Sequence, residues 1–360
     1  MTRATRATIN LRALQHNLTV ARRHAPDSRL MAIIKANGYG HGMVEVAQAL
    51  EHADAFGVAS IDEAISLREA GIPQPIVLLE GFVRGDALRL IEGYQLQPVI
   101  HHPEQIAILE QTPGPALDVW LKVDTGMHRL GMSPQDTPAM LTRLLNCPRV
   151  ASVRLMTHLA NADDREDDYT QEQIRRFESL DDLSVTARSV ANSAGLLGWP
   201  QSVSDWARPG IMLYGVSPFN NSLGKQHDLR PVMTLRAQLI AVNRHQAGEL
   251  IGYGGTWRCP EAMPMGVVSI GYGDGYPRHV PSGTPVLLGD RRVPIVGRVS
   301  MDMLCLDLRE CPEARIGDEV ILWGEGLPVE EIADAAGTIA YELLCKVTAR
   351  VEFEYTTSEA

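Results

Sequence analysis

The pattern of apolar and polar positions predicts a chain in two parts. From about residue 11 to residue 223, short apolar runs alternate with stretches whose apolar residues recur at helical spacing. This alternation favours a (β/α)8 TIM barrel, although a doubly wound open sheet would give the same pattern. The eight strands that we expect lie at 30–34, 56–59, 76–80, 98–101, 117–124, 153–158, 189–193 and 211–214.

Polar residues mark the expected starts of several helices. Asn10 stands where an N-cap would precede the first helix. Ser60 with Glu63, and Thr170 with Gln173, have the spacing of capping boxes, in which a hydroxyl and a later carboxylate or amide accept from unpaired backbone N–H groups. We therefore expect two further helices to begin at these positions.

From about residue 224 the pattern changes to short alternating runs separated by turn residues. It predicts a second, mostly β domain over 224–360, with strands at 232–242, 265–270, 285–288, 293–296, 303–307 and 319–323. Two glycine-rich stretches, 252–255 and 271–276, interrupt these runs. They are interpreted either as loops that face a ligand or as ordinary hairpin turns.

Composition narrows the class of function. A formal net charge of -11 over 360 residues argues against binding to nucleic acid, which requires a basic surface. No apolar run is long enough to span a bilayer, and no secretory leader is recognised. The five cysteines form no CxxC pair and no zinc spacing, so we expect free thiols, no metal and a cytoplasmic location: Cys147, Cys259, Cys305, Cys311 and Cys345.

The stretch 30–42 is the strongest local candidate for a chemical site. A buried strand is predicted to end at Lys35, and Gly38, Gly40 and Gly42 then allow the backbone to turn close to a ligand. A lysine at the rim of an apolar core has its ammonium form disfavoured, which makes the free amine available for Schiff-base chemistry. The alternative is a solvated lysine in an ordinary turn.

Other polar residues also end predicted strands. In a barrel the carboxyl ends of the strands meet at one face, so these side chains would converge there. His101 and His102 are interpreted as structural histidines. The full set at the strand ends is Lys35, Glu80, His101, Lys122, Asp124, His158, Asn192 and Ser193, with Arg208 just before the last strand.

Six motifs together resemble the alanine racemase family, the fold type III pyridoxal phosphate (PLP) enzymes. They follow the family's order over nearly the whole chain: KANGYGHG at 35–42, KVDTGMHRLG at 122–131, RPGI at 208–211, GYGG at 252–255, GYGDGYPR at 271–278 and SMDM at 300–303. The resemblance implies a PLP-binding barrel over 11–223 and a β-rich domain over 224–360 that is joined by a strand from 1–10. It also implies a homodimer with shared active sites.

The resemblance implies two catalytic bases. Lys35 would hold PLP through a Schiff base and handle the α-proton of D-alanine. Tyr253, supplied by the partner subunit, would handle that of L-alanine. Because the ordinary pKa of tyrosine is about 10, the site would have to stabilise its phenolate or share its proton.

Four more residues receive roles from the resemblance. Arg208 would face the pyridine nitrogen of PLP, and His158 would orient Arg208. Arg129 would contact the phenolic oxygen of the cofactor and the carboxylate of the substrate. Lys122, which is carbamylated in many members of the family, would hold Arg129 in place.

The remaining implied contacts concern the phosphate and the substrate. Met301 and Tyr272 would reach across the dimer to enclose the carboxylate and methyl group of alanine. The phosphate would lie against hydroxyl and backbone N–H groups of Tyr39, Ser193, Tyr341, Gly210 and Ile211.

Three rival functions share parts of this pattern. A fold type III amino-acid decarboxylase would lack Tyr253 and Arg208 at their positions. A PLP-carrying homeostasis protein would be a barrel without the second domain, and a PLP-free Schiff-base aldolase would be colourless when purified. If the chain is a racemase, the sequence is compatible with a broader amino-acid specificity. It is also compatible with either role for the reaction, supplying D-alanine for peptidoglycan or feeding alanine catabolism.

Overall fold

The computed structural model describes residues 5–357, which divide into two compact units. One unit comprises residues 15–213 and 217–222. The other comprises the remaining described residues, and the boundary at its N-terminal end falls inside the first helix, between Leu14 and Gln15. Each unit is described separately below.

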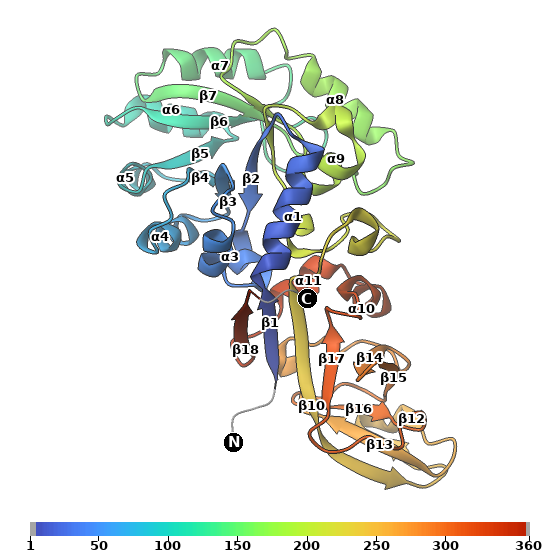
Figure 1. Ribbon diagram of the computed structural model, residues 1–360. Coiled ribbons are helices and arrows are strands. Elements are labelled where there is room, and N and C mark those ends of the chain that lie inside the picture. The colour runs from blue at the N-terminus through green and yellow to red at the C-terminus, as the bar shows by residue number, and fades with distance from the viewer. Residues whose placement is uncertain (1–4, 358–360) are drawn as a thin grey trace. The chain divides into compact units, whose positions relative to one another are not determined.

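The first unit is built around a closed barrel of eight parallel strands (Figure 1). Each strand pairs with its neighbours in chain order, and β9 pairs with β2 to close the ring. This confirms the predicted barrel and excludes an open sheet. The strands are β2 Arg29–Ile33, β3 Ala55–Val58, β4 Ile76–Leu78, β5 Leu96–Ile100, β6 Leu117–Lys122, β7 Val150–Met156, β8 Arg188–Ser189 and β9 Trp206–Ala207.

Helices connect the strands and lie outside the ring, and α1 precedes the first barrel strand (Figure 1). Most of their buried residues are apolar, as in Ile174 and Phe177 of α8, and a few are polar, such as Gln105 of α6 and Gln173 of α8. The helices are α1 Leu11–His24, α2 Lys35–Gly40, α3 Met43–Ala49, α4 Ile61–Glu69, α5 Leu88–Gly93, α6 Pro103–Gln111, α7 Thr137–Asn146, α8 Tyr169–Glu178 and α9 Ser193–Gly198.

The prediction of the eighth strand was wrong. Residues Ile211–Tyr214 form a 3-10 turn, and the strand that closes the barrel is β9, Trp206–Ala207. A strand of two residues is too short to produce an apolar run of its own. Ile211 and Met212 are almost completely buried, which explains the apolar run that suggested a strand there.

The lumen of the barrel is layered. Because side chains alternate along a strand, Trp120 and Lys122 of β6 share a side, and so do Trp206 and the following Arg208. The rings of Trp120 and Trp206 meet edge to face, with their centroids 5.7 Å apart. An aromatic layer in the strands is therefore followed, toward their carboxyl ends, by basic residues.

The second unit contains an eight-stranded sheet in the order β13-β16-β15-β14-β17-β10-β1-β18. The N-terminal strand β1 lies between β10, to which it is antiparallel, and β18, to which it is parallel. The strands are β1 Arg6–Asn10, β10 Met233–His245, β13 Met263–Val268, β14 Pro285–Leu288, β15 Arg291–Val296, β16 Leu304–Asp307, β17 Glu319–Trp323 and β18 Glu352–Thr356.

The six strands predicted from the alternating pattern of this part are all present, with ends that move by a few residues. The structure adds a small hairpin of β11 Leu250–Ile251 with β12 Trp257–Arg258, and the helices α10 Val329–Ala336 and α11 Ala340–Cys345. Among residues 5–357, no helix is both long enough and apolar enough to cross a membrane.

Two of the three predicted helix starts are confirmed. Asn10 Oδ1 accepts a hydrogen bond from Ala13 N at 3.0 Å, and Ser60 with Glu63 forms a complete capping box at the start of α4. The box predicted at Thr170 is wrong, because α8 begins one residue earlier and has no side-chain cap. The side chain of Gln173 makes other contacts, which are described below.

Removing the cap hydroxyl by Ser60→Ala should lower the free energy of unfolding by about 1 kcal/mol, because Glu63 N then loses the acceptor that lies at 3.2 Å. Ser66→Ala in the same helix is the matched control. Ser66 is exposed and bonds only to Asp62 O four residues back, so its replacement should be neutral or slightly stabilising. Equal effects of both substitutions in chemical unfolding would contradict the role of the cap.

Candidate active site

Lys35 begins a short left-handed helical turn. The four residues after it, from Ala36 to Tyr39, all have φ between 49° and 64° and ψ between 42° and 51°. Only Gly38 among them lacks a Cβ, and the left-handed conformation costs roughly 1–2 kcal/mol for each other residue. Such strain persists only where the surroundings hold the backbone firmly, which is typical of functional sites.

Two side chains hold this turn. Glu63 accepts from Ala36 N with one carboxylate oxygen and from Ala59 N with the other, each at 2.7 Å. Asn37 Oδ1 accepts from Met43 N at 3.0 Å. The residue next to Lys35 is thereby tied to the end of the neighbouring strand, which fixes where the lysine side chain starts.

Basic residues gather at the carboxyl end of the barrel strands. Lys122 is the last residue of β6, and burial lowers its pKa to about 8, with further lowering by Arg208, Arg129 and Lys35. Among residues 5–357, none of these four cations forms an ion pair with a carboxylate. The neutral amine of Lys122 is therefore more populated near neutral pH than it is in an ordinary lysine.

Arg208 follows β9 and is almost completely buried. Its guanidinium donates to Ser189 Oγ, to Thr157 O and, at 3.2 Å, to Val190 O. Burial lowers its pKa to about 10, so the group keeps its proton at physiological pH. The arginine is thus a rigid, permanently charged donor on the floor of the site.

His158 lies two residues beyond the end of β7. Burial lowers the pKa of its ring well below the usual value, and the neighbouring charges of Arg208, Lys122 and Arg129 lower it further. The imidazole is therefore neutral at physiological pH. A neutral ring next to several cations avoids adding another positive charge to the cluster.

A tight backbone segment follows Arg208. Ser193 Oγ accepts from Gly210 N at 2.8 Å and lies 3.4 Å from Met212 N. Tyr39 is buried, and its hydroxyl would be only 2.9 Å from a Cβ built on Gly210, so any other residue there would require the tyrosine side chain to move. Hydroxyl groups and backbone N–H groups beside an excess of positive charge are suited to an anionic group such as a phosphate.

The other predicted site residues lie in the second unit. Tyr253 is 69% exposed in the turn η5 Tyr253–Gly255, and Met301 is 52% exposed. Tyr272 lies in the turn η6 Tyr272–Asp274 and is 39% exposed, while Tyr341 lies on α11 and is half-buried.

The exposed loops of this unit are well anchored. Tyr272 N donates to Ser300 O at 3.0 Å, and Asp274, which is fully buried, accepts from Gly271 N at 3.0 Å. Arg350 pairs with Asp302 at 2.5 Å. Tyr272 is therefore presented to solvent from a rigid backbone.

The structure thus groups nine of the predicted site residues in one unit and four in the other. The four in the β unit are Tyr253, Tyr272, Met301 and Tyr341. The nine that follow barrel strands at their carboxyl ends are Lys35, Tyr39, Lys122, Arg129, His158, Ser193, Arg208, Gly210 and Ile211.

An unbalanced cluster of cations at a barrel mouth fits a ligand with several negative charges. Lys35 stands at the edge of this cluster on a held turn, so its amine can reach a carbonyl carbon of a bound anion. A phosphate-bearing aldehyde satisfies both conditions. In the described part of the chain, no three His, Cys, Asp or Glu side chains are grouped to hold a metal ion.

Sequence reasoning missed Glu63 and Asn37 as parts of the site. Glu63 was recognised only as a cap of α4, and its second carboxylate oxygen is the one that reaches Ala36. Asparagine tolerates left-handed backbone better than most residues, so Asn37 among glycines was the available signal. The link from Glu63 to Ala36 spans 27 positions and leaves no local pattern.

Comparison with known proteins agrees with this geometry. The family description "Alanine racemase, N-terminal domain" matches residues 9–218, and "Alanine racemase, C-terminal domain" matches residues 232–355. An alanine racemase of Coxiella burnetii (strain RSA 493 / Nine Mile phase I) is 53% identical over 360 residues, covering 98% of this chain and 99% of the relative.

Solved structures show the same likeness. The biosynthetic alanine racemase from Pseudomonas aeruginosa has a TM-score of 0.96 and 46% identity, with 98% of this chain and 99% of that chain covered. The alanine racemase from Bartonella henselae with covalently bound pyridoxal phosphate has a TM-score of 0.89 and 28% identity, with 98% and 99% covered.

Lys122→Met should raise stability most at pH values below about 8. The pKa of Lys122 is about 8 in the folded protein and 10.5 ordinarily, so between these values the unfolded chain binds more protons and wild-type stability rises with pH. The advantage of methionine should therefore shrink by a few degrees in Tm as the pH rises from 7 to about 10. The measurement requires buffer free of carbon dioxide, so that Lys122 stays an amine. A difference in Tm between the variant and wild type that does not change with pH would contradict the low pKa of Lys122 in the folded protein.

Proposed function

The chain belongs to the alanine racemase family, and we propose that it interconverts L-alanine and D-alanine with Lys35 and Tyr253 as the two bases. The reaction class is therefore an isomerase that acts on an amino acid. The observation that carries the assignment of roles is the strained, clamped turn that places Lys35 beside cations without a carboxylate partner.

Pyridoxal phosphate, when bound, supplies an electron-withdrawing ring that makes the α-proton of alanine acidic. Lys35 would hold its aldehyde carbon covalently. The phosphate would be held by the hydroxyl groups and backbone N–H groups that follow β8 and β9, which the tight packing at Gly210 supports. The full phosphate set is Tyr39, Ser193, Tyr341, Gly210 and Ile211.

Racemisation requires proton transfer on both faces of the α-carbon. A single fixed base would serve only one face well, so two bases are needed. Lys35 takes or returns the proton on the face of D-alanine, and Tyr253 does so on the face of L-alanine. The high exposure of Tyr253 in its own unit supports a role outside that unit.

Arg208 sets the electronic character of the site. Because its guanidinium keeps its proton at working pH, it would donate a hydrogen bond to the pyridine nitrogen of the bound cofactor without transferring a proton. A pyridine ring that is not protonated would withdraw less negative charge from the α-carbon of the substrate, which would disfavour side reactions. The neutral ring of His158 lies near Arg208 and helps to orient it.

Arg129 would bind the carboxylate of the substrate, and Lys122 would hold Arg129. The low pKa of Lys122 supports this, because the free amine is the form that reacts with carbon dioxide. Its nitrogen attacks the carbon atom of carbon dioxide, a proton leaves to solvent, and the carbamate carries a negative charge. The cation that repels Arg129 then becomes an anion that attracts it.

We also propose a homodimer whose active sites are each built from both subunits. Tyr272 and Met301 are exposed on anchored loops and Tyr253 is exposed in its glycine turn, as side chains at an interface would be before association. Met301 and Tyr272 would enclose the carboxylate and methyl group of alanine.

The proposed setting is the cytoplasm, where D-alanine would be made for peptidoglycan. All five cysteines are free thiols, which suits a reducing compartment. The likeness to a biosynthetic enzyme of Pseudomonas aeruginosa favours synthesis over catabolism.

Tyr253→Phe should slow removal of the α-proton from L-alanine far more than from D-alanine. Loss of a general base typically costs about 10²–10⁴-fold, and only the L face depends on the tyrosine. Exchange of the α-hydrogen in deuterated water, followed by mass spectrometry from each pure enantiomer, measures the two rates separately. An equal loss of the exchange rate from L-alanine and from D-alanine would contradict the assignment of two bases.

Two inactive variants should complement each other. In a heterodimer of Lys35→Ala with Tyr253→Phe, one site has both bases and the other has neither, so activity should recover to about half that of wild type. Differently tagged chains allow the heterodimer to be isolated, and a heterodimer of two Lys35→Ala chains is the control. Isolated heterodimers without recovered activity would show that the sites are not shared.

A further inference from the structure

Three helices of the barrel each carry a polar side chain that ties together two neighbouring strand-end loops. The residues are Glu63 on α4, Gln105 on α6 and Gln173 on α8. Each accepts a hydrogen bond from the loop that follows its own preceding strand and bonds to the loop that follows the strand before that. The barrel loops are thus linked in the pairs β2 with β3, β4 with β5 and β6 with β7.

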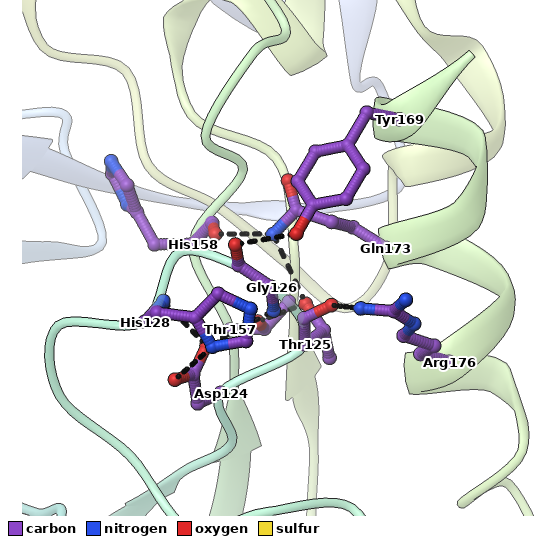
Figure 2. A network of polar contacts seen from close by, with 9 residues as sticks. All are labelled: Asp124, Thr125, Gly126, His128, Thr157, His158, Tyr169, Gln173 and Arg176. Carbon is purple, nitrogen blue, oxygen red and sulfur yellow. Dashed lines mark hydrogen bonds and ion pairs between the residues drawn. The ribbon is translucent and has the colours of Figure 1, made fainter.

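The side chain of Gln173, which forms the clamp on α8, is completely buried, and Figure 2 shows its contacts. Gln173 Oε1 accepts from Ala160 N at 2.8 Å, while Nε2 donates to His158 O at 3.1 Å and to Thr125 Oγ1 at 3.3 Å. Figure 2 shows the ring of His158 pointing away from the helix while its carbonyl faces Gln173. The amide therefore fixes the backbone of His158 and leaves its imidazole free.

Hydrogen bonds through Thr125 and Thr157 connect this clamp with Arg208, and the last step runs along Thr157 itself, from its hydroxyl to its backbone carbonyl. Thr125 Oγ1 and Thr157 Oγ1 share a hydrogen bond of 2.8 Å, and the guanidinium of Arg208 donates to Thr157 O. Thr125, Thr157 and Gln173 are almost fully buried, so water does not substitute for these bonds.

Two further residues of α8 hold the loop after β6. Arg176 Nη1 donates to Thr125 O at 2.9 Å, and the hydroxyl of Tyr169 donates to Gly126 O at 2.8 Å (Figure 2). This loop continues to Arg129. Helix α8 thus presents one polar face to the loops that carry Arg129 and His158.

We propose that Gln173 is a positioning residue for the racemisation, because its amide sets the places of His158, Arg208 and the Arg129 loop relative to one another. This rests on the proposed function of those groups. The requirement is for an amide in particular: one atom accepts from an N–H group and the other donates to a carbonyl and a hydroxyl. A carboxylate in its place would set a negative oxygen against His158 O.

Gln105 provides a matched control within the same barrel. It is almost fully buried, its Oε1 accepts from His101 N at 2.7 Å, and its Nε2 donates to Phe82 O at 2.8 Å. It therefore makes the same kind of clamp between the loops after β4 and β5. None of the residues proposed for catalysis or binding lies in those loops.

The test compares Gln173→Met with Gln105→Met in the cofactor-loaded enzyme. Both substitutions keep the length of the side chain and remove its hydrogen bonds, so both should lower Tm to a similar extent. Gln173→Met should also reduce kcat about tenfold or more with a smaller change in KM, and should change the visible circular dichroism of the bound cofactor. Gln105→Met should stay within about twofold of wild type in kcat, with an unchanged signal.

Equal effects of the two substitutions on kcat and on the dichroism signal would overturn the proposal, because Gln173 would then be only structural. If Gln173→Met does not fold, Thr125→Val breaks the same path without changing the shape of the side chain, and the same split should appear. Gln173→Glu should not restore kcat, and full activity of that variant would count against the amide requirement. A wild-type chain that leaves alanine unchanged would refute the proposed function instead, while the dichroism comparison would still test the clamp.

Discussion

Mutual repulsion among the basic groups at the barrel mouth is the constraint on which the site depends. Lys122 ends β6 and Arg208 follows β9 in the same closed barrel, and no carboxylate forms an ion pair with either in the described chain. The protein relieves the repulsion in three ways: the pKa of Lys122 is lowered to about 8, the pKa of His158 is lowered so that its ring is neutral, and Arg208 donates to backbone carbonyls. The positive charge that remains attracts a phosphate and a carboxylate, so binding these anions reduces the repulsion among the basic groups.

The rigid parts of the barrel hold this charge in place. The left-handed turn after Lys35 is strained, and the strain is sustained by Glu63 and Asn37 and by the burial of Tyr39. Glu63 serves two purposes, since the carboxylate that completes the cap of α4 also reaches the turn. Helix α4, which packs outside the barrel, therefore fixes the backbone next to Lys35. The same arrangement recurs on α6 and α8. Linking neighbouring loops in pairs is thus how this barrel fixes the relative positions of the loops at the carboxyl ends of its strands.

Sequence reasoning predicted most of the fold because long apolar runs and turn residues are local signals. It predicted seven barrel strands and six strands of the β unit, and it failed at β9, whose two residues lie between Asp205 and Arg208 and so form no longer apolar run. Gln173 was misread as a cap because its spacing from Thr170 fits a capping box, whereas its partners lie 13 to 48 positions away. Residues named by resemblance, such as Ser193 and Gly210, do lie together at the strand ends, but the contact with Glu63 that holds the left-handed turn at Ala36 spans 27 positions and leaves no local pattern.

The separation of the two proposed bases between the units of the chain has a physical rationale. Lys35 lies at the start of a barrel loop that Glu63 of α4 holds, whereas Tyr253 is 69% exposed on a glycine turn of the β unit. Two bases that act on opposite faces of one carbon atom must approach it from opposite directions, and the clamped turn that holds Lys35 fixes only one of those directions. Supplying the second base from a different rigid body resolves this. If that body belongs to a second copy of the chain, catalysis becomes linked to association by mass action, and dilution below the dimer dissociation constant removes Tyr253 from the site while leaving Lys35 in place.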